Sequence, residues 1–151
     1  MALQDKIDQD IKAAMLAKDN ATLRGLRAIK AAILLAKTEK GPAEELSEQT
    51  EISVLQKLAK QRRESAEIYQ QQNREDLYQI EMEELAVIER FLPKQLSREE
   101  IEANVRQLIA ETGATGPKDM GKVMGLANKR LAGKADGKTI SEIAKTLLTG
   151  G

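Results

Sequence analysis

Apolar residues recur every three to four positions along almost the whole chain, which is the period of amphipathic α-helices. One run begins at Leu3, and a second extends from Leu23 to Leu34 after a polar break at Asp19 and Asn20. Alternation of apolar and polar residues, which marks a half-buried β-strand, is nearly absent. The pattern therefore predicts an all-α fold of about seven helices.

Residues that begin or end helices divide the first part of the chain into four helices. Gly41 and Pro42 end the second one, because glycine favours a helix C-terminus and proline cannot continue a helix. Ser47 is placed to cap a long third helix, and Asn73 is placed to cap a fourth. Pro93 ends that fourth helix and marks the best domain boundary.

Three shorter helices are predicted in the rest of the chain. Ser97, with Glu100 three residues later, predicts a capping box at the start of the first one. Gly113 is its expected end, and a loop over 133–137 separates the last two helices. These lengths and tight turns are typical of a small helical bundle.

The two parts differ in charge, although the whole chain has 24 basic and 24 acidic residues. We expect a larger N-terminal helical domain over 1–94 and a three-helix domain over 95–151. Residues 1–93 carry a net charge of −3, whereas residues 116–151 carry a net charge of +4. A local positive surface can attract phosphate even on a neutral protein, because charges are screened beyond about 10 Å. A solvated basic face is the simpler alternative.

Composition excludes several kinds of active site. The chain has no His and no Cys, which rules out a Ser-His-Asp or Cys-His site, a disulfide and a Cys-bound metal within it. We expect no catalytic residue, no metal and no cofactor, although a carboxylate site for magnesium or calcium stays open. No apolar run approaches the roughly 20 residues of a membrane span, and the acidic N-terminus is unlike a secretory signal. These features lead us to expect a cytoplasmic protein.

The glycine-containing loop over 133–137 is the first candidate for binding. Its glycines allow close approach of the backbone, and the helix that follows presents free N–H groups to an anion. The basic residues around it complete a possible phosphate-binding surface. The candidate residues are Lys122, Lys129, Arg130, Gly133, Lys134, Gly137 and Lys138. A helix–helix turn that needs glycine, with Asp136 as a capping residue, is the structural alternative.

A second unusual feature is the pair Gly121 and Gly125 inside a predicted helix. Each costs about 1 kcal/mol relative to alanine, so something should offset that cost. Close packing of another helix is the more common reason. Close approach of an RNA backbone, with Lys122 alongside, is the functional alternative.

Two groups of basic residues also fall within predicted helices. Lys57, Lys60, Arg62 and Arg63 form a possible second polar surface on the long third helix. Lys60 and Arg63 have glutamates four residues later and can pair with them along the helix, whereas Arg62 has no partner at that spacing.

Arg24 lies among apolar residues of the second predicted helix. For Arg24 we prefer an ion pair with a neighbouring helix, to which the acidic fourth helix offers Glu81, Glu83 and Glu84.

Four segments taken together carry a family resemblance: Lys60–Ser65, Phe91–Ser97, Asp119–Gly125 and Gly133–Gly137. In this order and spacing the chain resembles the stand-alone YqeY proteins of the GatB/YqeY family over almost its whole length. The YqeY module is similar to the C-terminal tail of GatB, the B subunit of glutamine-dependent aspartyl/glutamyl-tRNA amidotransferase.

The resemblance implies an all-α fold with a larger N-terminal and a smaller C-terminal part. It also implies a tRNA-contacting role, with candidate contacts at Lys122-Val123-Met124 and Gly133–Asp136. The kinase and amidase sites of the amidotransferase lie elsewhere in that enzyme. A carbon–nitrogen ligase label with glutamine as amido donor would therefore apply to this chain by association.

Three functions are open at this point. The first is an accessory module that binds tRNA or another structured RNA through the basic C-terminal part. The second is a protein-interaction module that docks on an amidotransferase or a synthetase through its long amphipathic helices. The third is an enzyme that uses carboxylates and Mg²⁺, for which the sequence gives no specific catalytic signal.

Overall fold

The computed structural model describes residues 2–41 and 46–150. The described residues form seven α-helices, one 3₁₀ helix and no β-strand, which confirms the predicted all-α fold. The helices are α1 (Leu3–Ala17), α2 (Asn20–Lys40), α3 (Glu48–Gln71), α4 (Glu75–Glu89), α5 (Arg98–Thr112), η1 (Pro117–Asp119), α6 (Met120–Arg130) and α7 (Gly137–Leu148). The chain divides into two compact units, Met1–Leu92 and Pro93–Gly151, and each is described by itself.

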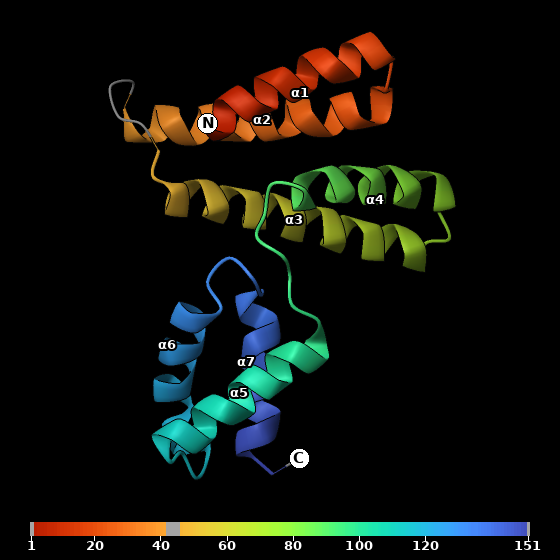
Figure 1. The fold of residues 1–151 in the computed structure, drawn as a ribbon. Coiled ribbons are helices and arrows are strands. Elements are labelled where there is room, and N and C mark those ends of the chain that lie inside the picture. The colour runs from red at the N-terminus through yellow and green to blue at the C-terminus, as the bar shows by residue number, and fades with distance from the viewer. Residues whose placement is uncertain (1, 42–45, 151) are drawn as a thin grey trace. The chain divides into compact units, whose positions relative to one another are not determined.

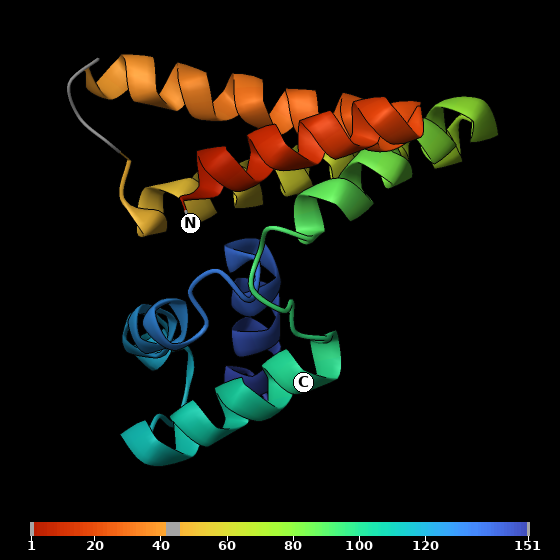
Figure 2. The ribbon, with the colours of Figure 1, turned by 45° about the horizontal axis from the view of Figure 1, so that its top comes forward.

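The first unit consists of two antiparallel helix pairs, α1 with α2 and α3 with α4 (Figure 1). Helix α2 packs on both α4 and α3, so the two pairs form two layers (Figure 2). Burial of apolar side chains between the layers is the main force that holds them together. The core contains Ile7, Leu26, Ile29, Ile33, Leu55, Ala59, Leu85, Val87 and Ile88.

The second unit is built from α5, α6 and α7, each of which contacts the other two. Its helices are short, and each buries one apolar stripe. The resulting core is separate from that of the first unit. It contains Ile101, Val105, Leu108, Val123, Ala127, Leu131, Ile140, Ile143 and Ala144.

Several predicted helix ends are confirmed. The Ser97 hydroxyl accepts a hydrogen bond from the Glu100 amide at 3.1 Å, and the Glu100 carboxylate accepts one from the Ser97 amide at 3.1 Å. Gly113 ends α5 in the left-handed conformation, with φ of 68°. Ser47 caps α3 by accepting from the Thr50 amide at 3.1 Å. Pro42, which we expected to stop the second helix, lies outside the described residues.

Two other helix starts differ from expectation. Asn73 does not cap α4; it takes the left-handed conformation, with φ of 57°, and the N-cap position falls on Arg74. Asparagine tolerates this conformation better than most residues, so it serves the turn between α3 and α4. The second of the three short predicted helices is preceded by the 3₁₀ turn η1, and α6 itself starts at Met120.

No helix in the described part of the chain has the length and apolar character needed to span a membrane.

Candidate functional site

Helix α6 has one buried face and one exposed basic face. Val123 and Ala127 are fully buried in the core of the second unit. Lys122, Gly125 and Lys129 are exposed and recur at three and four residues, so they share the opposite face. The helix contains three basic residues and no acidic one. This exposed face is therefore positively charged along its length.

The two glycines of α6 do not serve the packing of the described chain. A Cβ atom placed on Gly121 or Gly125 would meet no other atom within 4 Å. Tight packing against another helix, the more common reason for such glycines, is thus wrong for this pair. The interior of the protein leaves their low helix propensity unexplained. Close approach of an RNA backbone remains a prediction.

The backbone of the predicted loop is held by the segment that follows Pro93. The Gln95 side-chain amide donates to the carbonyl of Pro93 at 2.7 Å and to that of Gly133 at 2.8 Å. The Leu96 amide donates to the Lys134 carbonyl at 2.9 Å. Gly133 is buried and has a φ of 76°, a conformation that favours glycine. The loop is thus a fixed turn, while the Lys134 side chain remains exposed.

The start of α7 lies next to this turn. Asp136 occupies the N-cap position, but its side chain makes no capping hydrogen bond. Gly137 and Lys138 are the first two residues of the helix, and both are exposed. The prediction of Asp136 as the capping residue is therefore confirmed by position, without a side-chain hydrogen bond.

Two candidate cations interact with acidic side chains. Arg130 forms an ion pair with Glu111 of α5 at 2.9 Å, and its hydrogen bond lowers the pKa of that carboxyl. The hydrogen bond from the Thr115 amide lowers the pKa of Asp119, and Lys118 and Lys122 add smaller effects in the same direction. Arg130 is thus tied to α5, whereas Lys122 makes no ion pair within the described residues.

The possible second polar surface on α3 is divided by its contacts. Arg62 pairs with Glu84 of α4 at 2.8 Å, and Arg63 lies 3.6 Å from Glu89. Lys57 and Lys60 are exposed. The partner of Arg62 could not be found at helical spacing because it lies on another helix.

The ion pair expected for Arg24 is confirmed. Its guanidinium contacts Glu83 at 2.8 Å and Glu84 at 3.1 Å. Glu84 is only 7% exposed and also accepts from Arg62, so one carboxylate joins α2, α3 and α4. These three charges stabilise the contact between the two layers and leave little positive charge for a ligand.

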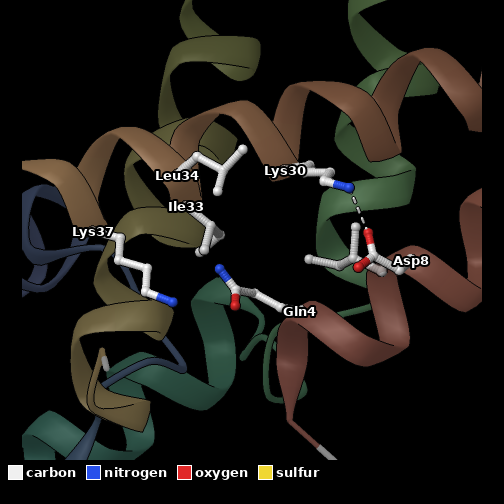
Figure 3. A pocket seen from close by; sticks show the side chains of 7 residues that line it. Gln4, Asp8, Lys30, Ile33, Leu34 and Lys37 are labelled. Atoms are coloured by element: carbon white, nitrogen blue, oxygen red, sulfur yellow. Dashed lines mark hydrogen bonds and ion pairs between the residues drawn. The ribbon is translucent and has the colours of Figure 1, made fainter. Parts of the chain in front are cut away.

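A groove between α1 and α2 was not predicted. It has a volume of about 150 Å³, and its lining includes the buried side chains of Ile7 and Ile33. Figure 3 shows Ile33 of α2 beside Gln4 of α1. Lys30 pairs with Asp8 at 2.7 Å on one side. The other lining residues are Gln4, Leu34 and Lys37. The sequence does not reveal this groove, because its buried lining residues Ile7 and Ile33 have the same spacing as ordinary core residues.

The described residues contain no group of three or more His, Cys, Asp or Glu side chains that could hold a metal ion. Taken together, the fold and the surface define a class of small all-α protein. In its first unit the arginines Arg24 and Arg62 pair with carboxylates of α4. In its second unit one face of α6 is basic.

The model of the Yqey-like protein family matches residues 4–148, and the chain belongs to this family. Three relatives are each named altered inheritance of mitochondria protein 41, mitochondrial. The Kluyveromyces lactis protein is 31% identical over 89% of this chain and 69% of its own length. The Meyerozyma guilliermondii protein is 30% identical over 99% of this chain and 77% of its own length. The Clavispora lusitaniae protein is 34% identical over 75% of this chain and 66% of its own length.

These relatives contradict the expected cytoplasmic location, because all three are named as mitochondrial proteins. The expectation rested on the absence of cysteine and of a secretory signal. Both features distinguish secreted proteins from others and do not separate the cytosol from an organelle.

Proposed function

We propose that the C-terminal unit binds tRNA or another structured RNA, and that the protein acts as an accessory factor. One observation carries the proposal: exposed lysines lie on α6, whose two glycines present no side chain, and in the turn and first residues of α7 that follow it. Phosphate contacts by lysine supply most of the affinity in such binding, and they make it dependent on salt. The lysines are Lys122, Lys129, Lys134 and Lys138, none of which has an ion pair within the described residues.

The likeness to the GatB tail supports the same surface. The carried-over segments, Lys122-Val123-Met124 and Gly133–Asp136, lie on α6 and in the turn before α7. Val123 is fully buried in the core, so the candidate contact at Val123 is wrong. Gly133 and the Lys134 backbone are engaged in hydrogen bonds within the unit, so we assign contact with RNA to the lysine side chains. Recognition of RNA by shape and phosphate fits a surface without aromatic side chains, since such a surface cannot stack on bases.

The test is fluorescence anisotropy of labelled total tRNA with the purified full chain at about 50 and 200 mM salt, a range over which several phosphate contacts change affinity strongly. The test variant is Lys134→Glu with Lys138→Glu. The matched control is Lys57→Glu with Lys60→Glu, which changes the net charge equally on exposed residues of the first unit.

We expect the test variant to bind more weakly and to lose about one unit of salt slope for each phosphate contact removed. The control variant should bind nearly as well as the unchanged protein. Absence of binding at the lower salt would reject RNA recognition by this protein. An equal loss in both double variants would reject the assigned surface.

A second candidate function is protein docking at the groove between α1 and α2. Leu34 lines this groove and is 48% exposed, and Lys37 has no ion pair within the described residues. These features fit an acidic amphipathic helix of a partner, whose apolar face would cover Leu34. Capture of such a partner should survive nuclease, be lost in Leu34→Glu, and persist in Lys134→Glu with Lys138→Glu. Capture that is lost on nuclease treatment would reject docking.

A further inference from the structure

The junction of α2, α3 and α4 contains more negative than positive charge. Three carboxylates of α4, those of Glu81, Glu83 and Glu84, meet two guanidiniums, Arg24 of α2 and Arg62 of α3. The formal charge of the ionised cluster is therefore −1. Removing charges from water is costly unless each is paired and hydrogen-bonded, so an excess charge here requires compensation.

The contacts show which carboxylate is the least well compensated. Glu84 accepts hydrogen bonds on both oxygens, from Arg24 at 3.1 Å and from Arg62 at 2.8 Å. Glu83 accepts one from Arg24 at 2.8 Å. Glu81 lies 3.2 Å from Arg62, but its buried Oε2 atom makes no hydrogen bond. The Nε atom of Arg62 is also buried and without a partner.

We propose that Glu81 is a proton-binding site that makes the packing of α4 on α3 and α2 responsive to pH. A proton taken from solvent onto the Glu81 carboxyl removes the excess charge of the cluster and leaves Glu84 with both of its arginine partners. Loss of that proton at higher pH returns the excess negative charge to the junction of the three helices, on a carboxylate whose buried Oε2 accepts no hydrogen bond.

The groups that face Glu81 set the direction of its titration. Burial raises the pKa of Glu81. Arg62 opposes the rise, Glu84 reinforces it, and Arg24 opposes it. A carboxyl whose pKa is higher in the folded than in the unfolded state stabilises the fold at low pH. That contribution is lost as pH rises through the folded pKa.

The direct experiment is a carboxyl ¹³C NMR titration of Glu81 in the unchanged, isotopically labelled full chain. We expect a midpoint above the ordinary glutamate value of about 4.3. A midpoint at or below that value would overturn the proposal. Because this measurement needs no substitution, it does not depend on whether a variant folds.

The second experiment compares melting temperatures of Glu81→Gln, Glu83→Gln and the unchanged chain between about pH 4 and 8, which spans ordinary and raised glutamate pKa values. Glutamine at position 81 resembles the protonated acid, so Glu81→Gln should gain melting temperature relative to the unchanged chain as pH rises. Glu83→Gln, which loses a partly exposed and paired carboxylate, should show no such gain. The same pH dependence in Glu81→Gln as in the unchanged chain would reject the site.

Discussion

Each unit has a glycine within a helix, Gly25 in α2 and Gly125 in α6, and the surroundings of the two glycines are opposite. A Cβ atom on Gly25 of α2 would lie 2.8 Å from the Cβ of Val87 on α4, a separation that real Cβ atoms do not tolerate. A Cβ atom on Gly125 of α6 would meet nothing within 4 Å. The first glycine permits the close approach of two helices, whereas the second leaves a helix surface bare.

The charged residues show the same contrast. Arg24 and Arg62 of the first unit are directed to a shared carboxylate between helices. Lys122 and Lys129 of the second unit are exposed and have no ion pair within the described residues. Unusual residues of the first unit are thus explained by its own interior, whereas the contacts of the described residues do not explain those of the second unit. This difference is the reason for seeking a ligand on α6.

The largest expected effect comes from removing the central charge of the first unit. Glu84→Ala removes the shared acceptor of hydrogen bonds from Arg24 and Arg62, although Glu83 and Glu81 still lie beside those guanidiniums. Each lost hydrogen bond to a charged group costs about 1.5 kcal/mol or more, so we expect a total loss of about 3 kcal/mol. Helical circular dichroism during urea unfolding of the full chain measures this loss. Glu89→Ala is the matched control on the same helix, since its exposed pair with Arg63 contributes less than about 1 kcal/mol. Equal losses in the two variants would contradict a central role for Glu84.

The next effect tests the close approach at Gly25. Gly25→Ala should destabilise the protein by about 1–3 kcal/mol, because the added methyl group forces α2 and α4 apart. Helix propensity alone would give the opposite sign, a gain of about 1 kcal/mol. The double variant Gly25→Ala with Val87→Gly, which removes the opposing Cβ, should recover part of the loss relative to the sum of the single changes. Strict additivity in that cycle would place the cause elsewhere.

Several local signals in the sequence predicted local structure correctly, although Asn73 does not cap α4 as expected. The Ser97 capping box and the left-handed Gly113 follow from residues a few positions apart, so a short stretch of sequence determines them. Arg24 also signalled its ion pair, because a charge within an apolar helix needs a partner. By contrast, the bridge from Gln95 to Gly133 joins residues 38 positions apart and depends on tertiary packing.

The candidate site was harder to predict than the fold. Gly25 and Gly125 look alike in sequence, and only the surroundings of each helix reveal that one is enclosed and the other open. Similarly, Arg62 and Lys60 belong to one basic segment, but the first is paired with α4 and the second is exposed. Sequence patterns place such residues on a helix without showing which other part of the fold packs against them.

A smaller effect tests a local feature of the second unit. Ser97→Ala removes the N-cap of α5 and should lower the free energy of unfolding by about 1 kcal/mol, measured by urea unfolding of the full chain.

The same capping box predicts a dependence on pH. The hydrogen bond from the Ser97 amide lowers the pKa of Glu100, so this carboxylate contributes stability above its unfolded pKa. That contribution is lost as pH falls through the folded pKa, which is the opposite direction to Glu81. A thermal-melt series in acid should therefore show less acid sensitivity for Glu100→Gln than for the unchanged chain; equal sensitivity would contradict the capping role of Glu100.

The smallest effect on stability separates folding from binding at α6. Gly125→Ala should stabilise the protein by roughly 0.5–1 kcal/mol, because alanine has the higher helix propensity and the methyl group meets open space. The substitution leaves every charge in place, so a weaker affinity for labelled tRNA at unchanged salt slope would arise from added bulk on the helix face. Loss of stability would show that this face is covered within the protein. A stabilised variant with unchanged affinity would place the RNA contact away from Gly125 and leave the lysines of the turn and α7 as its basis.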